Sequence, residues 1–330
     1  MKLPHRRYVL HLAAGAAALP AVSRSACAQT YPARPIKIIV PFAAGGPTDT
    51  IGRIMAEGMR ASLGQPVTIE NVAGAAGSIG VGLAARSASD GYTLSLGTLG
   101  TNVVNGAIYP LQYDLINDFE PVSLLVTNPL LIVARKDLPA KDLKDLIAWL
   151  KTNSDKASQG TAGVGSPSHV AGVFFQKETG TRFQFVPYRG AAPAMQALLA
   201  GQIDLMIDLV ANCLPQVRAG TIKAYAVTDR SRLTTEPDIP SVDEAGLPGL
   251  YISVWHAFFV PKGTPKTVIA KLDAAVVDAL GNPAVRQRLA DLGQEIYPRE
   301  QQTPEALAAY HKAEIEKWWP IIKAAGIKAE

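Results

Sequence analysis

The feature that most constrains the fold is an alternation of short β-branched runs with segments whose apolar residues recur at helical spacing. Residues 36–40 predict a buried strand, and the apolar stripe that follows predicts a helix ending at Gly64. Such an alternation predicts an α/β fold in which helices cover parallel sheets. The predicted strands are residues 36–40, 67–70, 92–96, 183–186, 204–207 and 222–227.

Two longer extended stretches interrupt this alternation. Residues 120–135 form the first, broken by Asn128-Pro129, and residues 251–260 form the second. Two crossings suggest that the chain leaves one domain, builds another and returns, as a hinged clamp requires. A single large α/β domain with two long strands is the alternative. We place the first domain at residues 29–127 and 256–330, and the second at residues 128–255.

The amino terminus predicts export. A short basic segment precedes an uncharged apolar run at residues 8–22, and residues 26–28 have the small-x-small pattern of a signal peptidase site. We therefore expect a signal peptide of residues 1–28, cut before Gln29, and a periplasmic mature protein. Adjacent arginines leave the Sec and twin-arginine routes both open. The alternative is an amino-terminal core helix.

Removing this segment changes the charge and the cysteine count. It holds four basic residues and no acid, so the formal charge falls from +4 to zero. A nucleic-acid partner thereby loses its electrostatic support. Cys213 becomes the single cysteine, which excludes an internal disulfide. The mature chain is expected to be soluble, because no other segment approaches transmembrane length.

The strongest local motif is the turn of residues 41–49, where a buried strand ends, two glycines follow and a helix begins. The first helical turn has unpaired N–H groups and the positive end of the helix dipole, so the turn can cradle an anion. It lacks the nucleotide and dinucleotide patterns. Thr48 could donate through its hydroxyl. Asp49 could face a ligand or serve as a first-turn acid, and the whole motif could be an ordinary strand-to-helix turn.

A second cradle is predicted at residues 163–169. Ser166 and Ser168 supply hydroxyls, and Pro167 favours a helix start. A serine hydrolase is the competing hypothesis, but the Gly-x-Ser-x-Gly elbow is missing. His169 follows too closely in sequence to indicate a base across a cleft, and it could simply pack at the helix start.

Further candidates come from the strand ends of the middle unit. Tyr188 could frame a pocket or cap the core, and Arg189 could pair with a carboxylate or stay in solvent. Asp208 lies at the carboxyl end of a predicted strand, where open α/β sheets bind ligands. It could equally hold a backbone amide. The three histidines of the mature chain are too widely separated to predict a metal site, and no cofactor is expected.

Together these motifs resemble the Bug-type receptors, the periplasmic solute-binding components of tripartite tricarboxylate transporters. The resemblance runs in order over essentially the whole mature chain. The matching segments are Tyr31-Pro-x-x-Pro-Ile36, Val40-Pro-Phe-x-x-Gly-Gly-x-x-Asp49, Gly64-Gln-Pro-Val-x-Ile-Glu-Asn71, Ala88-x-Asp-Gly-Tyr-Thr-Leu94, Val186-Pro-Tyr-Arg-Gly190, Gly201-Gln-x-Asp-Leu-Met206 and Ala245-Gly-Leu-Pro-Gly249.

The resemblance implies a type II periplasmic-binding-protein fold, with two lobes joined by two crossing strands and a ligand cleft between them. It also implies a set of ligand-binding residues, to which Tyr188 is added from the strand-end analysis. Pro167 and Asn212-Cys213 depart from the family pattern and leave the substrate open. The expected site residues are Phe42, Ala43, Gly46, Thr48, Asp49, Thr98, Thr101, Ser166, Ser168, His169, Tyr188 and Asp208.

The expected function is an extracytoplasmic receptor, not an enzyme, that binds a small carboxylate and delivers it to membrane permease subunits. Dicarboxylates, tricarboxylates, aromatic acids, amino acids and amides all suit two cradles. Burying an anion is costly unless its oxygens are fully hydrogen-bonded, so a ligand would favour the closed clamp. We expect a monomer. An exported hydrolase, and a receptor that presents its ligand to a sensor kinase, are the alternatives.

Overall fold

The computed structural model describes residues 31–188, 190–233 and 235–328. The predicted signal peptide and Arg189 therefore lie outside the described residues. Within the described ranges, no helix is both long and apolar enough to cross a membrane.

The strands form one mixed sheet in the order β2-β1-β3-β9-β4-β7-β5-β6, with β8 and β10 also paired to β4. The pairs of β1 with β2 and β3, and of β5 with β6 and β7, are parallel, as expected. The pairs made by β4 and β9 are antiparallel. The strands are β1 (Ile36–Val40), β2 (Val67–Asn71), β3 (Thr93–Thr98), β4 (Phe119–Arg135), β5 (Ser158–Thr161), β6 (Gln184–Pro187), β7 (Leu205–Leu209), β8 (Ile222–Val227), β9 (Ser253–Pro261) and β10 (Glu295–Ile296).

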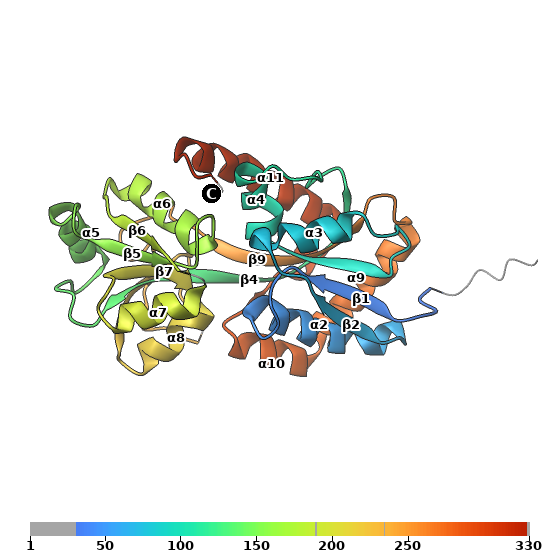
Figure 1. The fold of residues 1–330 in the computed structure, drawn as a ribbon. Helices are drawn as coiled ribbons and strands as arrows, with labels where there is room; N and C mark the ends of the chain where they lie inside the picture. The colour runs from blue at the N-terminus through green and yellow to red at the C-terminus, as the bar shows by residue number, and fades with distance from the viewer. Residues whose placement is uncertain (1–30, 189, 234, 329–330) are drawn as a thin grey trace, which may run out of the picture.

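Helices cover both faces of this sheet (Figure 1). Glycine ends α2 in the left-handed conformation at Gly64, as the sequence predicts. Short 3-10 turns at Ala75–Gly77 and Arg299–Gln301 and a π-helical turn at Gly100–Val104 complete the described elements. The α-helices are α2 (Pro47–Leu63), α3 (Ser78–Ala85), α4 (Asn105–Ile108), α5 (Leu143–Thr152), α6 (Pro167–Thr179), α7 (Ala191–Leu199), α8 (Val210–Arg218), α9 (Lys266–Gly281), α10 (Pro283–Asp291) and α11 (Pro304–Ala324).

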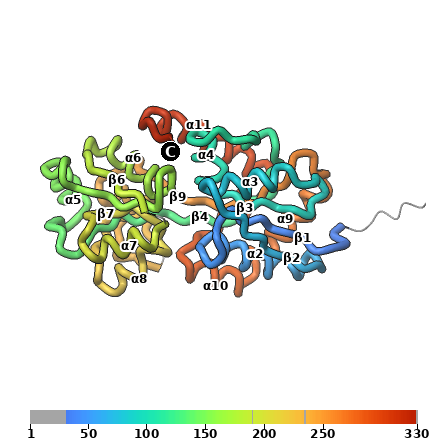
Figure 2. The backbone as a smooth tube through the Cα atoms, in the orientation of Figure 1, coloured from blue at the N-terminus to red at the C-terminus, as the bar shows by residue number. Residues whose placement is uncertain are grey.

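Strand β4 belongs to two parts of the sheet. Its first half pairs with β9 and β10, and its second half pairs with β7 and β8. We call the part containing β1, β2, β3 and β10 the first lobe, and the part containing β5, β6, β7 and β8 the second lobe. Figure 2 shows the backbone passing between the two lobes along β4 and β9.

The prediction that Asn128-Pro129 interrupts the first extended stretch is wrong. Both residues lie within β4, in register with Val254 and Ser253 of β9. At Leu130 the strand begins to pair with β7 instead. Pro129 has no N–H to donate, but it lies where the pairing of β4 changes from β9 to β7. Few sheet hydrogen bonds are therefore lost on either side.

Three hydrophobic clusters hold the layers together. Helices α2, α9 and α10 pack on one face of the first-lobe strands. Helices α7 and α8 cover one face of the second lobe. The largest cluster combines α3 and α11 of the first lobe with α5 and α6 of the second, and Phe174 of α6 packs edge-to-face on Trp318 of α11, with ring centroids 5.6 Å apart.

Two helices follow a Thr-Pro pair, and the two threonines make different hydrogen bonds. Thr303 caps α11, since its side chain accepts the Ala306 N–H at 3.1 Å. Thr264 does not cap α9: its hydroxyl donates to the Pro261 carbonyl at 2.7 Å, and the helix begins at Lys266. The hydroxyl serves the end of β9 instead.

Candidate ligand-binding cleft

A cavity of about 630 Å³ lies between the lobes, at the ends of β1, β3, β5 and β7. Its walls are the turn before α2 in the first lobe and the turn before α6 in the second. Most of the predicted site residues therefore come together in one place. Those on the cavity wall are Phe42, Ala43, Gly46, Thr48, Thr98, Ser166, Ser168 and Asp208.

In the first lobe, the turn presents the amino terminus of α2 to the cavity. Gly46 is the N-cap and makes no side-chain cap, and Pro47 opens the helix. The N–H groups of the first turn therefore have no side-chain acceptor, and they point to the cavity end of the helix. Thr48 adds a hydroxyl beside them. This end of the cleft supplies hydrogen-bond donors and a positive dipole.

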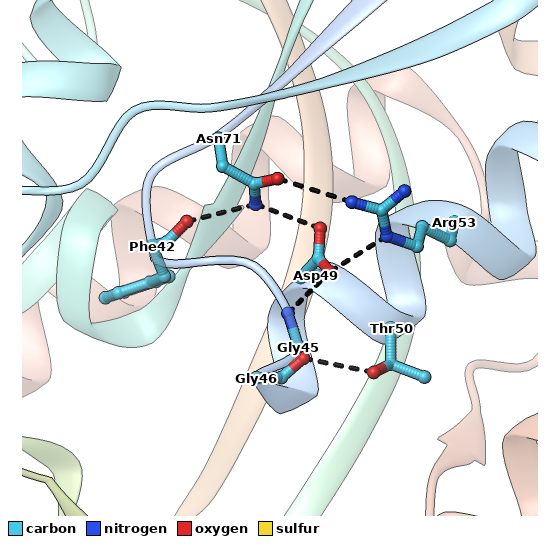
Figure 3. Close-up of polar contacts among 7 residues, drawn as sticks. All are labelled: Phe42, Gly45, Gly46, Asp49, Thr50, Arg53 and Asn71. Atoms are coloured by element: carbon cyan, nitrogen blue, oxygen red, sulfur yellow. Dashed lines mark hydrogen bonds and ion pairs between the residues drawn. The ribbon is translucent and has the colours of Figure 1, made fainter.

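Asp49 is not part of the cavity wall, and its side chain contacts the turn that precedes α2, as Figure 3 shows. Its carboxylate accepts from the Gly45 N–H at 2.8 Å, from Arg53 at 2.9 Å and from Asn71 at 2.9 Å. Asn71 also donates to the Phe42 carbonyl at 3.1 Å. Burial opposes ionisation, but the bonds from Arg53, Gly45 and Asn71 outweigh it and lower the pKa of Asp49. Asp49 fixes the turn from behind.

In the second lobe, the turn before α6 is held by neutral hydrogen bonds. Ser166 is the N-cap of α6 and accepts the His169 N–H at 3.3 Å. The Ser168 hydroxyl accepts the Ala162 N–H at 2.9 Å and lies 3.0 Å from the Ser166 hydroxyl. Gly165, at φ 75°, provides the left-handed step that a side chain would resist.

His169 faces away from the cleft. Its Nδ1 accepts the Gly165 N–H at 3.0 Å, and its ring packs edge-on against Phe185. It lines a separate, open hollow of about 780 Å³ between α6 and the end of α11. Burial lowers the pKa of His169. His169 therefore does not line the cavity between the lobes, because its bond to Gly165 turns the ring to the back of the loop.

Two other predicted residues also lie off the cavity wall. Thr101 is fully buried behind Thr98 and accepts the Thr98 N–H at 3.0 Å. Tyr188 is half-buried and packs against the second-lobe cluster under α7 and α8. Of the two roles considered for Tyr188, the core role matches this position.

Asp208 is the one acid among the described residues of the cavity wall, and it is 4% exposed. Asn212 donates to it at 2.7 Å. Burial raises its pKa to about 6, because the hydrogen bonds from Asn212 and the Leu209 N–H offset only part of the cost of ionisation. Among the described residues that line the cavity there is no lysine or arginine, so an anion there would be held by backbone N–H groups and hydroxyls.

Several cavity residues escaped the sequence analysis. Ala76 and its neighbour Ala75 adopt positive φ angles of 50° and 45°, an unusual conformation for alanine. Asn105 holds this turn by donating to the Ala76 carbonyl at 2.9 Å. The bracketing glycines of Gly74-Ala-Ala-Gly77 were a signal that could have been used. His256 and Gln294 carry no local signal, because strand pairing alone brings them to the cleft.

The cleft offers no site for a metal ion: over the described ranges, no cluster of three or more histidine, cysteine, aspartate or glutamate side chains is suitably placed. The cavity can hydrogen-bond a small molecule between the starts of α2 and α6. Two lobes, two crossing strands and such a cleft define the class of two-lobed solute-binding proteins.

Comparison with known proteins identifies the family. Residues 51–327 match the model of the tripartite tricarboxylate transporter family receptor. A protein of Agrobacterium vitis, described as "UPF0065 protein in the TAR-I ttuE-ttuC' intergenic region", is 43% identical over 298 residues, covering 90% of this chain and 86% of its own. The chain belongs to the tripartite tricarboxylate transporter receptor family, whose members are periplasmic solute-binding proteins.

Solved structures agree with this assignment. The periplasmic binding protein BugD is 41% identical, with a TM-score of 0.80, over 91% of this chain and all (100%) of its own. MatC from Rhodopseudomonas palustris, solved with bound malate, is 40% identical, with a TM-score of 0.79, over 88% of this chain and all (100%) of its own. The predicted Bug-type family and fold are confirmed, and the chain is a solute-binding receptor.

Proposed function

We propose that the mature protein is an exported, monomeric receptor that binds a small carboxylate between its lobes and passes it, chemically unchanged, to a membrane permease. The observation that carries this proposal is the convergence of two helix starts, α2 and α6, on one cavity without any cationic side chain among its described lining residues. Such a site suits a carboxylate, whose oxygens accept but do not donate.

The ligand-binding residues we propose are those on the cavity wall, with Thr48 and Ser168 supplying hydroxyls from opposite lobes. Ser166 and Asp208 complete the second-lobe side. MatC was solved with malate, and a small dicarboxylate of this kind is the class we propose first for this chain.

The lobes are proposed to close about β4 and β9, with the domain boundary inside these two strands. Ligand oxygens are fully paired only when both cradles meet, so the ligand stabilises the closed state. Small-angle scattering with and without ligand would measure this change. An unchanged radius of gyration at saturating ligand would contradict the clamp.

The central experiment is native mass spectrometry of the purified protein, followed by a thermal-shift panel of dicarboxylic, tricarboxylic, aromatic and amino acids. Thr48→Ala and Ser168→Ala should each weaken binding of the best acid, whereas the exposed Thr152→Ala serves as the matched control. If neither variant changes affinity, the proposed site is wrong.

The competing enzyme hypothesis predicts a different outcome in the same experiment. An exported hydrolase would consume its ligand, and the mass of the recovered molecule would change. A receptor returns it unchanged at a ratio of one per chain. A sensor-coupled receptor would bind identically, so a pull-down with candidate permease and kinase ectodomains separates those two roles.

A further inference from the structure

His256 is a buried histidine in the floor of the cleft, on one of the two strands that join the lobes. It lies in register with Thr98 of β3 and Val126 of β4. Its side chain borders the cavity but is only 2% exposed. A buried polar ring needs a hydrogen-bond partner, so its partner indicates its role.

The hydrogen bonds available to the ring select one tautomer. The Nε2 atom lies 3.3 Å from the Thr48 hydroxyl oxygen, whereas Nδ1 is buried without a partner among the described residues. Burial lowers the pKa of His256 to about 3, so the ring is neutral and has one proton. A proton on Nδ1 would be an orphaned buried donor, which is rarer and costlier than an unpaired acceptor. The proton therefore belongs on Nε2, donated to Thr48.

This bond leaves the Thr48 proton unused. Thr50, two residues along the same helix, donates its hydroxyl to the Gly46 carbonyl at 3.1 Å (Figure 3). Within the described part of the chain, Thr48 has no such carbonyl partner, and its oxygen already accepts from His256. Since Thr48 lies on the cavity wall, its proton is directed to a group in the cleft.

We propose that His256 is a positioning residue: by donating to Thr48, it fixes the Thr48 hydroxyl as a donor aimed at a carboxylate oxygen of the ligand. This inference rests on the proposed function and narrows it. A donor fixed beside the N–H groups of α2 suits an acceptor-only carboxylate. A carboxamide would turn its own N–H groups toward these donors. The end of the ligand held by α2 is therefore an ionised acid, and the amide analogue is rejected.

The tautomer is tested directly on the ligand-free protein. The ring nitrogens of His256 are measured by long-range proton–nitrogen correlation in labelled protein, with His256→Gln used for assignment. We expect the Nε2-protonated pattern, and the Nδ1-protonated pattern would overturn the proposal. Because no ligand is involved, this result does not depend on the proposed function.

The coupling to the ligand is tested by a double-mutant cycle with malate as the probe. His256→Phe and Thr48→Val should each raise the Kd about tenfold, the value of one hydrogen bond to a charged group. The double variant should be no weaker than either single variant. Effects that multiply in the double variant would overturn the proposal, because they would show that His256 does not act through Thr48.

Two control variants test whether a loss of affinity comes from the missing hydrogen bond or from a disturbed structure. His256→Gln keeps an N–H donor near the Nε2 position and should retain most of the affinity, whereas His256→Phe should not. Thr179→Val removes a buried threonine hydroxyl at the far end of α6 and should leave binding unchanged. If no acid in the panel binds the wild type, the proposed function fails, while the tautomer still decides the role of His256.

Discussion

Among the described residues, each lobe buries one carboxylate near the cleft, and the pKa values of the two are shifted in opposite directions. Asp49 of the first lobe receives hydrogen bonds from Gly45, Arg53 and Asn71, and its pKa is lowered. Asp208 of the second lobe receives a side-chain bond from Asn212 and has a pKa raised to about 6. The paired acid faces the interior of its turn, and the poorly compensated acid faces the cavity. Hydrogen-bond partners and depth of burial together separate a structural acid from one available to a ligand.

The largest effect is expected for Asp49→Ala, which tests the structural role of the first-lobe acid. Removal of the carboxylate leaves the Gly45 N–H, the Asn71 amide and Arg53 without their acceptor. We expect a loss of about 3 kcal/mol in the free energy of unfolding, the low end for breaking a buried pair because Arg53 is half exposed. Urea unfolding measures it. Glu57→Ala, which breaks the exposed pair with Arg288, is the control, and an equal loss there would contradict the role given to Asp49.

Asp208→Asn should act in the opposite direction. The folded pKa of Asp208, about 6, exceeds its ordinary value of 3.8, so its contribution to stability is complete below pH 3.8 and is lost as pH rises through 6. The asparagine variant escapes this loss and should be more stable than wild type by up to about 3 kcal/mol at pH 8. Thermal unfolding at pH 4 and pH 8 tests the difference. An equal difference in stability between the variant and wild type at pH 4 and pH 8 would contradict the raised pKa of Asp208.

The two turns should also respond differently to acid. The pKa of His169 is lowered by burial from 6.5, so its contribution is present above pH 6.5 and is lost as pH falls through the lowered value. The Gly165 amide should then lose protection worth about 1 kcal/mol. The Gly45 amide, bonded to Asp49, should keep its protection throughout. Hydrogen exchange of both amides, followed as the pH is lowered from 7.5, checks this, and an equal loss of protection at both amides would contradict the difference between the turns.

The smallest expected effect is that of Asp208→Asn on the reactivity of Cys213, which is fully buried next to Asp208. Burial raises the pKa of its thiol, and the nearby carboxylate adds to this. Iodoacetamide should therefore modify Cys213 very slowly in the native state and readily in urea, as followed by peptide mass spectrometry. Asp208→Asn should change this only slightly. Rapid modification of Cys213 in the native state would mean that solvent reaches the region around Asp208.

Much of the fold follows from local patterns. The residues of β1 and β8 match the predicted ranges residue for residue, because β-branched runs are local signals. The partners of β4 could not be predicted in this way, since Pro129 signals a break and only tertiary pairing shows that the strand continues. Short strands without an apolar run, such as β5 with its sequence Ser-Gln-Gly-Thr, were not predicted at all.

In the candidate site, too, local patterns predict which residues lie in the turns but not where their side chains point. Thr48 and Ser168 sit in strand-to-helix turns, whose glycines, proline and hydroxyls identify them from the sequence alone. Side-chain direction is not encoded at that level: Asp49 and His169 share those turns yet face away from the cavity. His256 could not be found, because a residue inside a strand gives no sign of which neighbouring element will meet its ring.

The paired positions of Asn128 and Val254 have one further consequence. The chain enters the second lobe through β4 and returns from it through β9, so the first and last residues of the second-lobe segment are neighbours in the sheet. A segment whose two ends are neighbours can be replaced by the same segment of a relative without distortion of the first lobe. Receptors with hybrid selectivity could therefore be assembled by transplanting this segment between relatives, with one half of the cleft inherited from each parent.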